Sequence, residues 1–164
     1  MSFGYVKTPA DGPQWWFLDT RMVVKAAAEQ TGGAFALIEW SAPAGFGPPL
    51  HQHNTEDEAF YLFEGAIDVQ CGDDRWTVGP GDFVFLPRGV PHGFVVADGP
   101  VRGLQITSPA GFERFVAELG REPEGPGLPE PSAPDVPRLA EASGRYGHEI
   151  LGPPLTAWST TLTA

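Results

Sequence analysis

Residues 45–65 read GFGPPLHQHNTEDEAFYLFEG and hold two of the four histidines of the 164-residue chain, His51 and His53, one residue apart. Alternate side chains of an extended strand point to the same face, so these two imidazoles face the same way, about 7 Å apart along the chain. Glu58 opens the next apolar run, and a glycine stands at each end of the stretch. The stretch therefore predicts two strands that carry a histidine pair and a carboxylate.

The sequence around this stretch consists of short apolar runs separated by turn residues. These runs extend from Trp15 to about Thr107 and are WWFL, MVVKA, AFALIEW, AFYLFEG, AIDVQCG, RWTVG, DFVFLP, HGFVV and VRGLQIT. Glycine, proline and aspartate fill the breaks between them, which is the chemistry of tight turns. Many short strands at this spacing predict an all-β sandwich or barrel, and closure into a barrel would leave no open sheet edge.

The pattern changes to helical after the last run. Apolar residues at i, i+3, i+4 and i+7 predict a helix with Gly120 as its C-cap, and they are Phe112, Phe115, Val116 and Leu119. A proline-rich linker over 121–134 follows, and Asp135 is the candidate N-cap of a second short helix that Gly147 terminates. Residues 148–164 predict only irregular structure.

These patterns divide the chain into four expected segments. They are an N-terminal extension (1–13), an antiparallel β-barrel (14–108), a helix packed on the barrel (109–120), and a linker, short helix and tail (121–164). We expect the C-terminal helix either to cover the barrel mouth as a lid or to help form a homodimer, and the sequence leaves both open.

Composition excludes several classes of function. The formal net charge is −11 and the pI is about 4.6, so the chain lacks the basic face that nucleic acids and anionic membranes require. A single cysteine, Cys71, excludes an intramolecular disulfide framework. The sequence shows neither a signal peptide nor a long apolar run, so we expect a cytoplasmic location.

A third histidine completes a candidate metal site. His92 lies in PGDFVFLPRGVPHGF, where another strand begins. If the strands carrying these residues are neighbours, His51, His53, Glu58 and His92 can converge inside the barrel. Three imidazoles and one carboxylate suit a borderline divalent transition metal such as Fe, Ni, Mn, Co, Cu or Zn, and not calcium or magnesium.

The spacing of these residues resembles the two sequence motifs of the cupin superfamily. Gly45, five residues, His51, one, His53, four, Glu58, six, Gly65 matches the first motif, and Gly81, five residues, Pro87, one, Gly89, two, His92 matches the second. At this composition the two spacings would arise by chance with probabilities on the order of 10⁻⁴ and 10⁻². The resemblance implies a jelly-roll β-barrel with its metal near one mouth. One departure is Val96, where many cupins have an asparagine that is not a ligand.

A finer resemblance covers roughly residues 14–154. The segments around the histidine pair, PRGVPHGF, SPAGFERFVAELG and RYGHEILGPP are similar to single-domain bacterial cupins of the quercetin dioxygenase-like group. This resemblance implies a metal-dependent dioxygenase that uses O₂ on a small flavonol, phenolic or enolic substrate. Glu58 would then be both metal ligand and acceptor of the substrate's hydroxyl proton, and a flavonol would lose carbon monoxide on ring cleavage.

Two other readings of the site stay open. One is a non-oxidative metal-dependent cupin, such as a polyketide cyclase or isomerase, and the other is a small-molecule-binding cupin without catalysis. In each case we expect an apolar pocket whose lining is Phe60, Leu62, Phe94, Phe35 and Trp40.

The remaining polar candidates have weaker claims. Asp57 should point away from its neighbour Glu58, because consecutive strand residues face opposite sides, so Glu56, Asp57 and Glu58 are not expected to form a carboxylate dyad. We expect His148, in the C-terminal tail, to be structural or solvent-facing.

Overall fold

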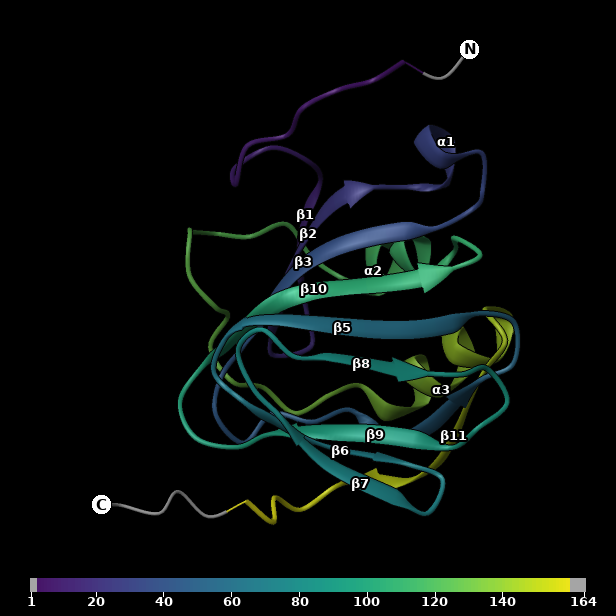
Figure 1. Cartoon of the computed structure of the whole chain (residues 1–164). Helices are drawn as coiled ribbons and strands as arrows, with labels where there is room; N and C mark the ends of the chain where they lie inside the picture. The colour runs from purple at the N-terminus through teal and green to yellow at the C-terminus, as the bar shows by residue number, and fades with distance from the viewer. Residues whose placement is uncertain (1–2, 160–164) are drawn as a thin grey trace.

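The computed structural model describes residues 3–159 and shows two antiparallel sheets packed face to face (Figure 1). The larger sheet contains, in spatial order, β1 (Gln14–Phe17), β2 (Thr20–Ala26), β3 (Ala36–Ala42), β10 (Val101–Ser108), β5 (Asp57–Glu64) and β8 (Phe83–Leu86). The smaller sheet contains β11 (His148–Pro154), β4 (Pro49–His53), β9 (His92–Val96), β6 (Ile67–Cys71) and β7 (Asp74–Val78).

The predicted all-β jelly-roll architecture is confirmed, but the expected closure into a barrel is wrong. Within residues 3–159 the edge strands β7 and β8 pair only with β6 and β5, and not with each other. The two sheets are held together by side chains between them, and their edges carry no shared hydrogen-bond ladder. The fold is therefore a jelly-roll sandwich.

The core lies between the sheets because the inner faces alternate with the outer ones. Strand β3 buries every second residue of ALIEWSA, and β10 does the same along VRGLQITS. Three aromatic rings from both sheets meet at the centre: Trp40 of β3, Phe60 of β5 and Phe94 of β9, with centroids 5.3–5.4 Å apart. These edge-to-face and tilted contacts hold the three rings in place beside the candidate site.

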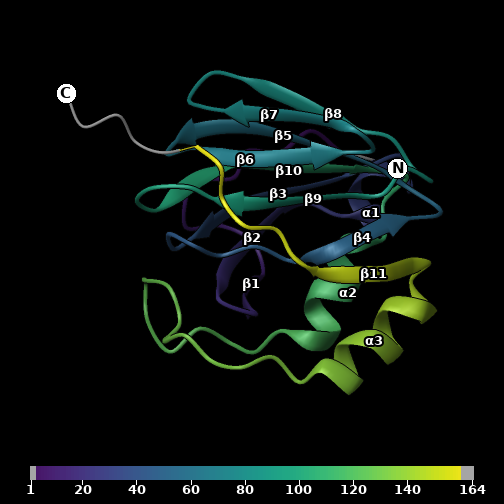
Figure 2. The ribbon, with the colours of Figure 1, turned by 90° about the horizontal axis from the view of Figure 1, so that it is seen from below.

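Three helices accompany the sheets. The short α1 (Ala28–Thr31) follows β2, and α2 (Phe112–Leu119) and α3 (Val136–Arg145) lie together beside β1 and β11 (Figure 2). The predicted cap of α3 is confirmed, since the Asp135 side chain accepts a hydrogen bond from the Arg138 amide at 3.1 Å. Among the described residues, no helix is long and apolar enough to cross a membrane.

The C-terminal tail corrects the expectation of irregular structure. Residues His148–Pro154 form β11, which pairs antiparallel with β4 at the edge of the smaller sheet. An edge strand tolerates proline because its outer amides need no partner, so Pro153 and Pro154 do not prevent this pairing. Residues 160–164 of the tail lie outside the described residues.

Candidate metal centre

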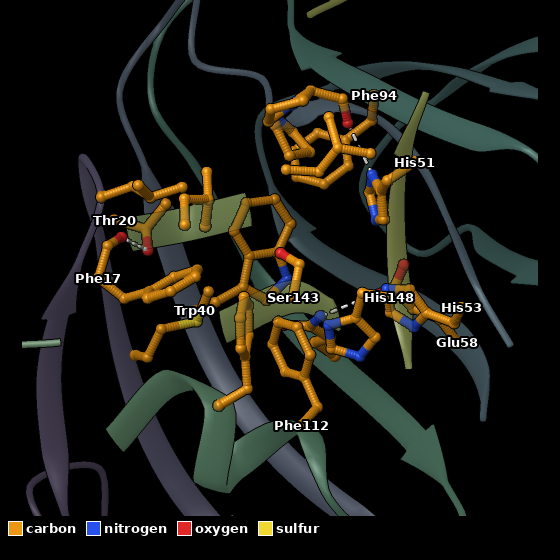
Figure 3. A pocket seen from close by; sticks show the side chains of 18 of the residues that line it. Phe17, Thr20, Trp40, His51, His53, Glu58, Phe94, Phe112, Ser143 and His148 are labelled. Carbon is orange, nitrogen blue, oxygen red and sulfur yellow. Dashed lines mark hydrogen bonds between the residues drawn. The ribbon is translucent and has the colours of Figure 1, made fainter. Parts of the chain in front are cut away.

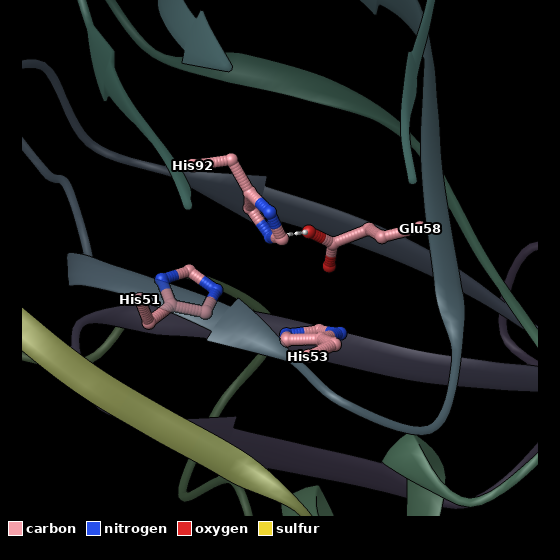
Figure 4. A group of neighbouring side chains, drawn as sticks. All are labelled: His51, His53, Glu58 and His92. Atoms are coloured by element: carbon pink, nitrogen blue, oxygen red, sulfur yellow. Dashed lines mark ion pairs between the residues drawn. The ribbon is translucent and has the colours of Figure 1, made fainter. Parts of the chain in front are cut away.

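The structure brings the four predicted metal ligands together between the sheets. His51 and His53 lie on β4, His92 on the neighbouring β9, and Glu58 reaches across from β5 (Figure 4). One ligand atom from each residue lies within 4.8 Å of the others. Since His51 and His92 stand opposite each other in the β4–β9 register, strand pairing fixes this arrangement.

Backbone carbonyls set the orientation of two of the imidazoles. His51 Nδ1 lies 2.7 Å from the Pro49 carbonyl, and His92 Nδ1 lies 2.9 Å from the Val90 carbonyl. Each Nδ1 therefore carries the proton and donates it, which leaves the Nε2 lone pair for a cation. Metal-binding histidines characteristically have their second nitrogen anchored in this way.

Burial and mutual charge set the protonation of the cluster. Burial lowers the pKa of His51 to about 4 and of His53 to about 3, although Glu58 opposes the shift in both. Burial alone would raise the pKa of Glu58, but the imidazoles of His53, His92 and His51 lower it well below its usual range. For His92, burial lowers the pKa and the Glu58 carboxylate raises it, with a net rise.

The chemistry of the donors fits a divalent transition metal. His51 and His53 are neutral and Glu58 is ionised at neutral pH, which is the state that coordination requires. His92 Nε2 is buried without a well-formed hydrogen bond and lies 3.2 Å from Glu58 Oε2. Two ligands about 2.1 Å from one metal are roughly 3.0–3.4 Å apart at octahedral or tetrahedral angles, so the spacing leaves room for a cation.

The three consecutive acids have three different environments. Glu58 faces the histidines, and Glu56 is buried beside His148. Asp57 points outward, as predicted, and forms an ion pair with Arg88 at 2.9 Å, which lowers the pKa of Asp57 to about 2. No carboxylate dyad forms, because the alternation of the strand separates Asp57 from Glu58.

Gln105 contacts the predicted base, Glu58, and the sequence patterns did not predict this role. This residue is buried on β10, and its Nε2 donates a hydrogen bond to Glu58 Oε1 at 2.5 Å. The signal was a polar side chain at an inward position of the alternating run VRGLQIT. That signal could not name Glu58 as the partner, because the pairing of β10 with β5 is not encoded locally.

His148 is structural, one of its two expected roles, and the alternative of exposure to solvent is wrong. The side chain is 6% exposed, and Nε2 lies 2.7 Å from Glu56 Oε1. Its ring stacks on that of His53, with centroids 4.3 Å apart. The reason is the pairing of β11 with β4, which sets His148 directly opposite His53.

An aromatic cavity opens beside the cluster (Figure 3). Of the residues predicted to line the pocket, Trp40, Phe60 and Phe94 do so. Leu62 lies instead in the closed core, fully buried and away from the cavity wall. Phe35 stands before β3 with 41% of its surface exposed, so its expected place in the pocket is wrong.

The C-terminal half of the chain closes one side of this cavity. Helix α2 contributes Phe112 and Phe115 to the wall, and α3 contributes Leu139 and Ser143. The predicted C-terminal helix therefore lies against the cavity, and the two expected roles of this helix, lid or dimer contact, stay predictions. Most of the lining is apolar; besides His51, His53 and Glu58, its polar residues are Thr20, Gln105, Ser143 and His148.

Comparison with known proteins agrees with the fold. A cupin domain model matches residues 39–107. Quercetin 2,3-dioxygenase of Bacillus subtilis (strain 168) is 27% identical over 138 residues, which are 84% of this chain and 41% of that enzyme. The chain thus spans about two fifths of the length of this curated relative.

Solved structures share the architecture at lower sequence identity. An RmlC-like cupin from Shewanella frigidimarina NCIMB 400 superposes with a TM-score of 0.59 at 16% identity, over 68% of this chain and 96% of that one. The polyketide cyclase RemF from Streptomyces resistomycificus superposes with a TM-score of 0.56 at 24% identity, over 65% of this chain and 80% of that one. At such identities these likenesses show the fold alone. The domain match and the two facing sheets show that residues 39–107 form a cupin domain within this fold.

Proposed function

We propose that this protein is a metal-dependent dioxygenase of the quercetinase-like type, acting with O₂ on a small flavonol, phenolic or enolic compound. The observation that carries the proposal is the convergence of His51, His53, His92 and Glu58 at the wall of an aromatic cavity. The likeness to the Bacillus subtilis dioxygenase over 84% of this chain supports it.

The cavity wall favours a flat and largely apolar substrate. Trp40, Phe60 and Phe94 line it on the sheet side, and Phe112 of α2 lines it as well. Aromatic walls bind planar rings by stacking and edge contacts, and they keep bulk water from a reactive intermediate. Because most of the cavity lining is apolar, a substrate would be oriented mainly by its contact with the metal and Glu58.

Glu58 has the position and the charge of a proton acceptor. Its lowered pKa keeps it ionised at neutral pH, and its two oxygens have different neighbours. Gln105 fixes Oε1, whereas Oε2 faces His92. One oxygen can therefore serve as a ligand while the other takes the proton of a substrate hydroxyl, whose O–H bond breaks to leave an electron-rich anion.

His51, His53, His92 and Glu58 would hold one divalent ion among Fe, Ni, Mn, Co, Cu and Zn. When bound, this ion would supply a Lewis acid for the substrate oxygen and, for each of these metals except redox-inert Zn(II), a route for electrons from the substrate to O₂. In the overall reaction O₂ is the oxidant and both of its atoms enter the products.

The test is oxygen uptake by protein loaded separately with each of these metals, against a panel of flavonols and enolic β-diketones. We expect O₂ and substrate to disappear together in at least one metal form. Glu58→Gln should retain metal better than His53→Ala while losing turnover, since its amide can coordinate weakly but cannot accept the proton.

Three results would contradict parts of the proposal. Substrate loss without O₂ uptake would assign a non-oxidative cyclase or isomerase activity to the site. Absence of both turnover and metal would favour a binding protein without catalysis. Full metal content in His53→Ala would overturn the ligand assignment itself.

A further inference from the structure

We infer that Glu56 and His148 position His53 for metal binding. The C-terminal strand β11, which carries His148, therefore contributes to the metal centre. The inference deepens the proposed function and rests on its metal site. It concerns a segment outside residues 39–107, to which the cupin domain model is matched. Glu56 and His148 are positioning residues, because they act through His53.

One carboxylate oxygen faces both imidazoles. Glu56 Oε1 lies 2.7 Å from His148 Nε2 and 3.3 Å from His53 Nδ1. All three side chains are buried, with residue exposures of 1% for His53, 4% for Glu56 and 6% for His148. His53 Nδ1 has no well-formed hydrogen bond within the described residues, so Glu56 is the acceptor in place when this nitrogen carries a proton.

This arrangement selects which nitrogen of His53 is available to a metal. A proton on Nδ1, directed at Glu56, leaves the lone pair of Nε2 for the cluster with His51, His92 and Glu58. The carbonyls of Pro49 and Val90 do the same for the Nδ1 atoms of His51 and His92. Glu56 thus accepts the Nδ1 proton of His53, as the two backbone carbonyls accept those of His51 and His92.

The contact between Glu56 and His148 is a hydrogen bond and not a second metal site. Two ligands on a tetrahedral metal, about 2.1 Å from each, would stand roughly 3.4 Å apart. The observed 2.7 Å is shorter than that and is ordinary for a charge-assisted hydrogen bond. His148 Nε2 therefore donates to Glu56 and holds the carboxylate in place.

Ring packing restrains His53 as well. His148 stacks on one side with centroids 4.3 Å apart, and Phe112 lies nearly parallel at 5.9 Å. Phe115 meets the His148 ring edge-on at 4.9 Å. The His53 ring is thereby held by aromatic contacts as well as by the carboxylate, and the rotation that would turn Nε2 from the cluster is hindered.

The backbone couples the same two segments. His53 and His148 are directly opposed in the β4–β11 register, and the Asn54 amide donates to the Gly147 carbonyl at 2.8 Å. When β11 pairs with β4, it therefore delivers His148 to Glu56. Figure 2 shows β11 running beside β4 directly after α3.

The experiment measures Co(II) affinity by chelator competition, together with the Co(II) absorption spectrum. We expect Glu56→Leu to weaken Co(II) binding about 10- to 100-fold, as outer partners of metal ligands usually do. His148→Phe keeps a stacking ring but removes the donor, so it should weaken binding by less and alter the spectrum. His148→Gln restores a donor and should recover much of the loss.

The matched control is a substitution on the same pair of strands, β4 and β11, at a side chain that faces away from the metal centre. Gln52 of β4 contacts Glu149 of β11 at 3.3 Å, and Gln52→Ala should leave both affinity and spectrum as in the unmodified protein. Circular dichroism checks folding in every variant. If a variant does not fold, ¹⁵N signals of the imidazoles in the Zn(II)-loaded unmodified protein decide instead: protons on His53 Nδ1 and His148 Nε2 support the inference, and their absence overturns it.

The outcomes separate the two proposals. Unmodified protein that binds no metal would overturn the proposed function and this inference together. Unmodified protein that binds Co(II), with unchanged affinity and spectrum in Glu56→Leu and His148→Phe, would overturn the inference alone.

Discussion

Gln105 holds the carboxylate of Glu58 by a hydrogen bond of 2.5 Å from Nε2 to Oε1, inside the closed space between the two sheets. The two residues lie on the adjacent strands β10 and β5. The bond leaves Glu58 Oε2 directed at His92, 3.2 Å away. Gln105 therefore decides which oxygen of the carboxylate faces the histidines.

Gln105→Leu should weaken metal binding by about tenfold, because Glu58 loses the partner that orients it. Chelator competition measures the change. Gln70→Ala is the control, since the Gln70 side chain is half-buried on β6 and bonds to the Gly72 carbonyl and to Arg75 instead of to Glu58. Equal metal affinity in Gln105→Leu and the unmodified protein would show that Glu58 needs no such support.

Metal removal should lower thermal stability, because a ligand that binds only the folded state stabilises it. At a free metal concentration 100 times Kd the gain is about 2.7 kcal/mol. We expect the melting temperature to rise on loading with Co(II) or Zn(II) and to fall again with a chelator. His53→Ala should show no such shift, and a shift of the same size there would place the metal elsewhere.

Phe60→Ala should lower the free energy of unfolding by about 3–5 kcal/mol, since it opens a cavity among buried rings. Phe60 is 1% exposed and packs against Trp40 and Phe94. Phe85→Ala, on the adjacent strand β8 with 52% exposure, should cost much less. Urea unfolding gives both values, and similar losses would contradict the placement of Phe60 in the core.

Gly65→Ala should destabilise the protein through both steric crowding and backbone strain, whereas Gly81→Ala should act through backbone strain alone. Both glycines have positive φ, 75° and 87°, which disfavours any side chain. A Cβ at Gly65 would also lie 2.4 Å from the Pro100 carbonyl oxygen, whereas at Gly81 it would meet nothing within 4 Å. We expect Gly65→Ala to be clearly the more destabilising in thermal unfolding, and equal effects would count against the close approach of residue 100.

Asp68 should make the attachment of the C-terminal tail sensitive to acid. Burial alone would raise the pKa of Asp68, but hydrogen bonds from Ser159, Thr77 and the Trp158 amide lower it below 3.8. A depressed folded-state pKa contributes stability that is present above the unfolded pKa of about 3.9 and is lost as pH falls through the folded value.

We therefore expect proteolysis of the tail near Trp158 to accelerate below about pH 4, the ordinary pKa range of an aspartate. The ring of Trp158 also lies over Arg75, at 5.1 Å from the guanidinium carbon, so its fluorescence reports the same detachment. In Asp68→Asn the tail should be loose at every pH tested. A pH response that survives in Asp68→Asn would assign the effect to another group.

Local patterns in the sequence predicted the ligands on β4 and β5 and the class of the fold. His51, His53 and Glu58 lie within eight residues, and the alternation of strands places all three on the inner side. The positions of His92 and of the turn glycines were predictable in the same way, because turn conformation and the alternation of strand faces depend on residues close in sequence. The apolar runs predicted the strands for the same reason.

The partners of these residues depend on the tertiary fold. Glu58 and Gln105 are 47 residues apart, and Glu56 and His148 are 92 apart. Alternation says which side of a strand a residue faces, but not which strand lies beside it, since that depends on how all apolar faces pack at once. For this reason the open edges of the two sheets and the burial of His148 against Glu56 could not be predicted locally. Phe35 differs, since it stands five residues before Trp40, an odd spacing that alternation assigns to the other face.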